Sequence, residues 1–108
     1  MMDRMSDPIY LSGPMSGYDG HNHKAFAYAC KTLRDLGHEV LSPHEVGEED
    51  GISWADYIRK DMPMLMRART VVVLDEWECS RGSVLEVHIA HALGVKVLPF
   101  AQAIREGL

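Results

Sequence analysis

The stretch Thr70-Val-Val-Val-Leu74, continued by Asp75-Glu-Trp-Glu-Cys-Ser-Arg-Gly-Ser-Val-Leu-Glu86, decides the fold. A short apolar run rich in valine is typical of a central strand in a parallel sheet, because helices cover both faces of such a strand. The Gly- and Ser-containing segment behind it is typical of a loop that leads into a helix. We therefore expect a buried strand over 70–74 and a loop over 75–81. A helix should follow that starts at Gly82 or Ser83 and stops at Gly94.

The same alternation of strand and helix extends outward from this stretch. The expected elements are a strand over 8–11, a loop over 12–17, a helix over 23–36, a strand over 39–41, a polar loop over 42–51, a helix over 54–66 and a strand over 95–98 before a short tail. The helix over 23–36 places Phe26, Ala29, Cys30, Leu33 and Leu36 on one face. Asn22 is its expected N-cap, and Ser53 with Asp56 resembles a capping box for the helix over 54–66.

Strands that alternate with helices pair in parallel through right-handed crossovers. We expect one domain over 1–108 with a three-layer, flavodoxin- or Rossmann-like α/β fold and strand order 2-1-3-4. In that order the first and third strands are neighbours whose helices leave on opposite sides, and ligands bind beyond their carboxyl ends. The loops that meet there cover 12–17 and 75–83, and they are rich in Gly and Ser.

Composition narrows the function classes. The 108 residues carry a formal net charge of −5, which argues against a binder of polymeric nucleic acid, since that role needs a basic face. No apolar run approaches the length of a membrane span, and the first residues do not resemble a signal peptide. Cys30 and Cys79 are expected to be reduced thiols of a cytoplasmic protein. His88 and His91 are three residues apart, and no metal-binding motif accompanies them.

Two loops carry the candidate chemistry. Small residues from Gly13 to Gly17 allow backbone N–H groups to approach an anion, although a simple tight turn explains them equally well. Ser80, Gly82 and Ser83 lie where a helix begins, and the N–H groups and dipole of a helix N-terminus favour negative charge. Trp77 is placed to stack on a base, with core packing as the alternative for it and for Trp54.

Taken together, these segments resemble a known family. Ile9-Tyr-Leu-Ser-Gly-Pro-Met-Ser-Gly17, Ser42-Pro43, Trp54, Asp61 and Trp77-Glu-Cys-Ser-Arg-Gly-Ser-Val-Leu-Glu86 are similar to the nucleoside 2-deoxyribosyltransferase superfamily, and most of all to its short, often phage-encoded members of the DUF4406 type. The resemblance covers about residues 9–98. The Ser-x-Gly-x-x-x-Glu spacing joined to Tyr-x-x-Gly after the first strand makes it specific.

The resemblance implies cleavage or transfer of an N-glycosidic bond. Glu86 matches the nucleophile that attacks the anomeric carbon, Tyr10 the tyrosine that orients it, and Asp61 the acid that handles the proton of the base. The implied substrate-binding residues are Gly13, Met15, Ser16, Gly17, Trp77, Ser80, Gly82 and Ser83. No metal or organic cofactor is implied. The implied partner is a small nucleotide or nucleoside, and members of this superfamily are usually homodimers or higher homo-oligomers. The apolar residues of the tail, over 97–104, are expected to be exposed and available to an interface.

The sequence departs from the nucleoside enzymes of this superfamily at Ser80. Those enzymes place an acidic residue six positions before the nucleophile, at the sugar 5′-hydroxyl, whereas the related nucleoside-monophosphate N-glycosidases place a serine that helps hold a 5′-phosphate. Ser80 therefore favours a 5′-monophosphate substrate. The first loop, however, lacks the basic character of those glycosidases. Arg81 is the residue that would compensate, and the sequence leaves open whether its side chain faces the loops or solvent.

Two other functions remain open from the sequence. A non-catalytic nucleotide-binding or sensing module can be built on the same fold, because fold does not fix function. The joint presence of Tyr10, Asp61 and Glu86 favours an enzyme over such a module. Cleavage of a dinucleotide such as NAD would need room for a second nucleotide, for which the short loops offer little.

Overall fold

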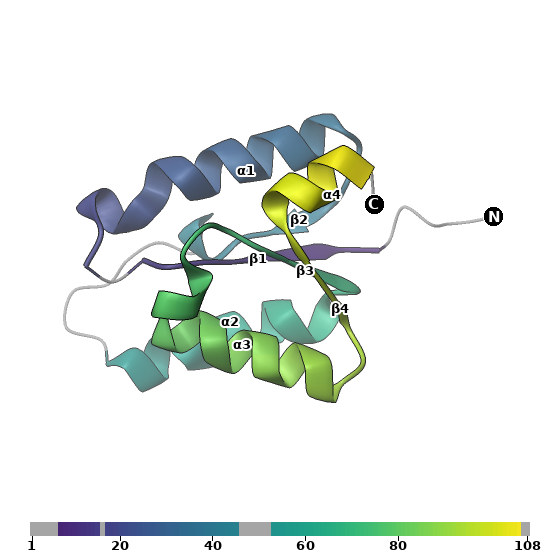
Figure 1. The fold of residues 1–108 in the computed structure, drawn as a ribbon. Coiled ribbons are helices and arrows are strands. Elements are labelled where there is room, and N and C mark those ends of the chain that lie inside the picture. The colour runs from purple at the N-terminus through teal and green to yellow at the C-terminus, as the bar shows by residue number, and fades with distance from the viewer. Residues whose placement is uncertain (1–6, 16, 46–52, 107–108) are drawn as a thin grey trace.

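A four-stranded parallel sheet forms the centre of the molecule (Figure 1). The computed structural model describes residues 7–15, 17–45 and 53–106. Its strands are β1 (Ile9–Ser12), β2 (Val40–Leu41), β3 (Thr70–Val73) and β4 (Lys96–Pro99), in the order β2-β1-β3-β4. Every neighbouring pair is parallel. The predicted strand order 2-1-3-4 and the α/β class are confirmed.

Helices cover both faces of this sheet (Figure 1). They are α1 (His23–Asp35), α2 (Trp54–Arg67), α3 (Arg81–Ala92) and α4 (Phe100–Glu106), and short 3₁₀ turns lie at Asp19–Asn22, Pro43–Glu45 and Trp77–Cys79. One core cluster joins Ile9, Leu11 and Val72 to α1 and α4. A second cluster joins Tyr10, Val71 and Val73 to α2 and α3. Because side chains alternate along a strand, successive residues of β1 face different helix layers.

Two helix starts differ from the sequence-based expectation. Asn22 occupies the N-cap position of α1, but its backbone is left-handed (φ 60°) and its side chain makes no capping bond. The Asn22 amide instead donates to the Pro14 carbonyl at 2.9 Å, so it ties the first loop to α1. The third helix begins at Arg81 rather than at Gly82 or Ser83, because the Ser80 hydroxyl accepts from the Ser83 N–H and caps it.

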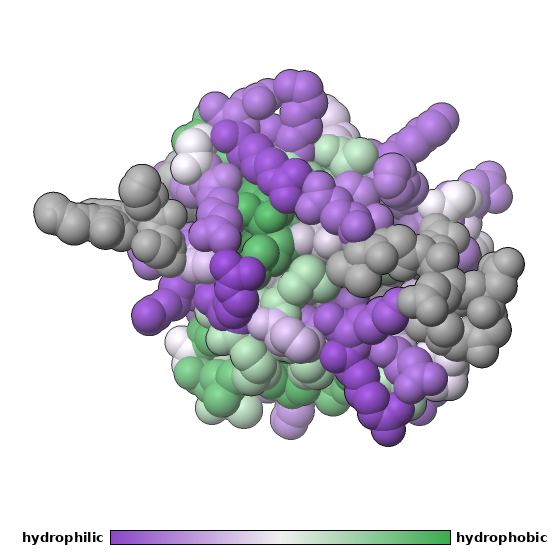
Figure 2. Space-filling model, turned by 180° about the vertical axis from the view of Figure 1, so that it is seen from behind, coloured by the Kyte–Doolittle hydropathy of each residue, from purple (hydrophilic) through white to green (hydrophobic). Residues whose placement is uncertain are grey.

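The expectation of an exposed apolar tail is wrong. Residues 100–106 form α4, and Leu98 and Ala103 are buried while Phe100 and Ile104 pack against the same core. The large hydrophobic side chains that are exposed are scattered instead: Tyr28, Leu36, Met66, Val84 and Leu93. Seen from behind, polar residues cover most of the surface, with hydrophobic ones in a central strip and along the lower edge (Figure 2). Within the described ranges, no helix is both long and apolar enough to span a membrane.

Candidate active site

A buried glutamate at the sheet–helix boundary is the centre of the site. Tyr10 and Ser12 are two residues apart on β1, so both side chains face α3. The Tyr10 hydroxyl donates to Glu86 Oε2 at 2.7 Å, and the Ser12 hydroxyl donates to Oε1 at 2.6 Å. Glu86 is 4% exposed, and both hydroxyl-bearing residues are fully buried. Both carboxyl oxygens of Glu86 are therefore held by hydroxyl groups from one strand.

A second carboxyl reaches the same place from α2. Burial raises the pKa of Asp61 to about 6, against the lowering effect of side-chain hydrogen bonding to Glu86 and Tyr10. Burial also raises the pKa of Glu86 to about 7, and the hydrogen bonds from Ser12 and Tyr10 oppose that rise. Because the two carboxyls interact, these values describe the titration of a pair.

The geometry indicates where the pair keeps its proton. Both oxygens of Glu86 already accept a hydroxyl hydrogen bond, which favours its ionised form. A proton held between the two groups is then better placed on Asp61. At near-neutral pH the site thus offers one carboxylate and one carboxylic acid side by side.

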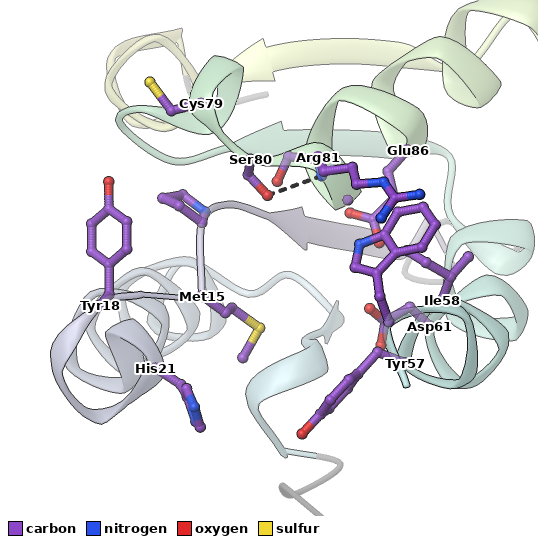
Figure 3. A pocket seen from close by; sticks show the side chains of 14 residues that line it. Met15, Tyr18, His21, Tyr57, Ile58, Asp61, Cys79, Ser80, Arg81 and Glu86 are labelled. Carbon is purple, nitrogen blue, oxygen red and sulfur yellow. Dashed lines mark hydrogen bonds between the residues drawn. The ribbon is translucent and has the colours of Figure 1, made fainter. Parts of the chain in front are cut away.

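A cavity of about 400 Å³ opens above these two carboxyls. Residues of the first loop and the following turn lie on one side of it, and side chains of α2 lie opposite (Figure 3). The start of α3 closes it between them. The lining residues are Pro14, Met15, Tyr18, His21, Trp54, Tyr57, Ile58, Asp61, Cys79, Ser80, Arg81, Gly82, Ser83 and Glu86. Such a volume lies at the small end of the range for ligand sites, about 300–1,000 Å³.

The structure brings most of the predicted site residues together. Met15, Ser80, Gly82 and Ser83 line the cavity with Asp61 and Glu86. Tyr10 lies beneath it, against Glu86. The predicted meeting of the loops after β1 and β3 is therefore found, and these loops, the start of α3 and the carboxyl pair surround one cavity.

Three predicted residues lie elsewhere. Trp77 is half-buried and packs against the core cluster of α2 and α3, so core packing accounts for it rather than base stacking. Gly13 lies against Leu74, where an added Cβ would come within 2.9 Å of the Leu74 Cβ. Gly17 has a φ of +82° and serves a turn. Ser16 is outside the described residues.

Sequence reasoning missed several side chains of the site. Ser12 was not singled out, although its spacing from Tyr10 on a strand was the available indication. Trp54 lines the cavity, and the Arg81 guanidinium carbon lies 3.6 Å from the centroid of the Trp54 ring. Tyr18 and Tyr57 face the cavity from opposite sides (Figure 3). The Tyr18 hydroxyl also donates to the Glu76 carboxylate. This hydrogen bond links the loops after β1 and β3.

The described residues give no sign of a metal centre. No group of three or more His, Cys, Asp or Glu side chains among them is arranged to hold an ion.

Comparison with known proteins places this site in a family. The family described as "Domain of unknown function (DUF4406)" matches residues 7–99. The chain belongs to the DUF4406 family. This DUF4406 domain is also similar to the solved structure of a 2-deoxyribosyltransferase from the psychrotolerant bacterium Bacillus psychrosaccharolyticus, with a TM-score of 0.67 and 26% sequence identity. The similarity covers 85% of this chain and 70% of that one. No curated protein matches this chain.

Proposed function

We propose that this chain breaks the N-glycosidic bond of a nucleoside 5′-monophosphate or nucleoside, with Glu86 as the nucleophile. The observation that carries the proposal is the buried Glu86 carboxyl, which lines the cavity while Tyr10 and Ser12 hold both of its oxygens. The likeness to a 2-deoxyribosyltransferase supports chemistry of this class.

The proposed reaction has two steps. The Glu86 carboxylate attacks the anomeric carbon, the bond from that carbon to the base nitrogen breaks, and Asp61 gives its proton to the departing base. Water or a second base then attacks the anomeric carbon of the glycosyl ester and releases Glu86. The proton lost by that nucleophile returns to Asp61, so the site ends as it began. The rigid hydroxyls of Tyr10 and Ser12 keep the carboxylate in place throughout.

The experiment that tests this mechanism compares wild type with Glu86→Gln on a panel of nucleosides and nucleoside 5′-monophosphates. Free base is measured by chromatography. We expect the wild type to release base and the variant to be slower by roughly 1,000-fold or more, since the nucleophile is lost. A folded Glu86→Gln protein with wild-type turnover would remove Glu86 from the mechanism. Tight binding by the wild type without release of base would favour a non-catalytic module.

The 5′-monophosphate is the favoured substrate in this proposal. Asp61 and Glu86 make the inner end of the cavity acidic, so an anionic group is best held at the start of α3. Ser80, Gly82 and Ser83 lie there, where the first N–H groups of a helix have no partner within the helix. The cavity volume of about 400 Å³ suits one nucleotide better than a dinucleotide.

Replacing Ser80 by Asp tests the phosphate. Asp is as good an N-cap as Ser, so Ser80→Asp should keep the start of α3 while it adds like charge beside the phosphate. We expect the wild type to prefer a 5′-monophosphate over its parent nucleoside, and the variant to lose or reverse this preference. The measurement is kcat/KM for a matched pair in both proteins. A wild type that prefers the nucleoside would end the phosphate proposal but leave the Glu86 mechanism in place.

A further inference from the structure

Arg81 contacts an aromatic ring where three other arginines contact a carboxylate. Arg34, Arg59 and Arg67 each form an ion pair with a carboxylate. The Arg81 guanidinium makes no such pair with any described residue and lies over the Trp54 ring, 3.6 Å from its centroid. An aromatic ring attracts a cation without neutralising its charge. Among the described residues, Arg81 thus has no carboxylate to compensate its positive charge.

This charge lies at the cavity. Arg81 and Trp54 both line it, and Figure 3 shows the Arg81 side chain extended across an indole between the start of α3 and α2. Among the described lining residues, Arg81 carries the permanently cationic group, while Asp61 and Glu86 are acidic. An anion that enters this cavity therefore finds its electrostatic partner in Arg81 rather than in the two carboxyls.

The two residues that follow Arg81 on α3 line the same cavity. The Ser83 hydroxyl is buried in the first turn of α3, and its oxygen has no hydrogen-bond partner. Buried hydroxyls are nearly always hydrogen-bonded, so an unpartnered one in a cavity wall points to a ligand. Gly82 lines the cavity without a side chain, and an added Cβ there would touch Ile58 Cδ1 at 3.5 Å and Trp54 Nε1 at 3.7 Å. A cation, a hydroxyl and a glycine backbone thus follow one another at the start of α3, in the wall of one cavity.

We propose that Arg81 selects anionic substrates: its guanidinium leaves the Trp54 ring to pair with a phosphate monoester held at the first turn of α3. The identity of the ligand as a nucleotide rests on the proposed function, whereas anion binding by Arg81 does not. Arginine suits this role because its planar fork matches two phosphate oxygens at once. When the Arg81 guanidinium leaves the ring, the face of the Trp54 indole that it covered becomes free toward the cavity.

Anion binding can be measured without turnover. In a Trp77→Phe background Trp54 is the remaining tryptophan of the two in the chain, so its fluorescence reports contact with Arg81. We expect inorganic phosphate to change the emission in a saturable manner and sodium chloride at equal ionic strength to leave it unchanged. Arg81→Gln should weaken the phosphate response about 10- to 100-fold, the range for one charged hydrogen-bonding partner. Arg81→Lys, which keeps a point charge, should fall between them.

Specificity provides the second measurement. The ratio of kcat/KM for a 5′-monophosphate to that for its nucleoside should fall about 10- to 100-fold in Arg81→Gln. The matched control is Arg59→Gln on α2, whose exposed side chain pairs with Asp56 and does not line the cavity. Equal phosphate titrations in wild type and Arg81→Gln, or an unchanged ratio, would overturn the assignment and make the Arg81–Trp54 stack a structural contact. If no nucleotide or nucleoside is turned over, the proposed function fails, and the phosphate titration still decides the role of Arg81.

Discussion

Glu86 and Asp61 need different protonation states in the proposed reaction, and their shared burial sets the pH at which both are available. The pair titrates with pKa values of about 6 and about 7. Below this range both carboxyls are protonated and the nucleophile is lost. Above it both are ionised and the base leaves without a proton. We expect kcat/KM to pass through a maximum between about pH 6 and about pH 7, as measured by base release over pH 4–9.

The variant Asp61→Asn separates the acidic limb of this pH profile, where the rate rises with pH, from the alkaline limb, where it falls. The amide cannot give a proton to the base, so the rate should fall by about 100- to 10,000-fold and the alkaline limb should disappear. The acidic limb remains because Glu86 must still ionise. Asp56→Asn, at an exposed position of the same helix, is the control and should keep the wild-type profile. An Asp61→Asn protein that retains both limbs would assign the alkaline limb to another group.

The residues proposed to be catalytic were easier to place from the sequence than the residues that surround them in the cavity wall. Glu86 and Tyr10 belong to spacing patterns that the sequence displays directly. Ser12 needed the strand register, because it is the alternation along β1 that turns it toward Glu86 beside Tyr10. Trp77 was the tryptophan expected at the cavity, and Trp54 lines it instead, since nothing local distinguishes an indole that faces a cavity from one that packs against the core.

At the scale of elements, the contact between the ends of β1 and β3 determines how near to each other the loops after these two strands begin. The Leu74 N–H donates to the Ser12 carbonyl at 2.9 Å, and Gly13 lies directly against Leu74. A methyl group at Gly13 would come within 2.9 Å of the Leu74 Cβ, which is fixed to the backbone. Gly13→Ala should therefore lower the free energy of unfolding by about 1–3 kcal/mol, as overpacked positions do.

The matched control is Gly82→Ala, whose added methyl would lie 3.5 Å from Ile58 Cδ1, an ordinary contact. We expect its stability to stay within about 0.5 kcal/mol of wild type in a urea titration. Its effect should instead be on turnover, because Gly82 lines the cavity. Equal stability losses in the two variants would show that the crowding at Leu74 is relieved by backbone movement.

The sequence predicted the regular elements and missed the last one. The long apolar periodicities of α1 and the valine run of β3 are visible locally. α4 has only seven residues and becomes a helix because Ala103 and Ile104 pack against the α1 face of the sheet. The start of α3 shifted for a similar reason, since Ser80 acts as a cap only once its hydroxyl meets the Ser83 N–H.

For the whole molecule, the buried pair of Asp61 and Glu86 links stability to pH. Burial raises the pKa of Asp61 to about 6 and that of Glu86 to about 7, so the folded chain holds the protons of the pair more tightly than the unfolded chain does. This contribution is complete below pH 3.8, and it is lost as the pH rises through about 6 to 7.

Glu86→Gln removes one carboxyl of this pair while it keeps the shape of the side chain. The variant should therefore gain stability relative to wild type as the pH rises from 4 to 8, by about 1 kcal/mol or more in the free energy of unfolding, because it has one buried carboxyl to ionise where the wild type has two. Urea titrations of both proteins at each pH measure the difference, and titrating groups away from the pair cancel in it. A difference that does not depend on pH would mean that the pair ionises in the folded chain as it does in water.

The two cysteines of the chain lie in opposite environments, with Cys30 buried in the core and Cys79 exposed beside the cavity. A maleimide dye will therefore attach to the native protein at one place, the rim of the site, without any engineered thiol. Such a dye would report every ligand that enters or leaves, and a bound ligand would shield Cys79 from alkylation. The unaltered chain is thus already suited to screening a compound library for its own substrate.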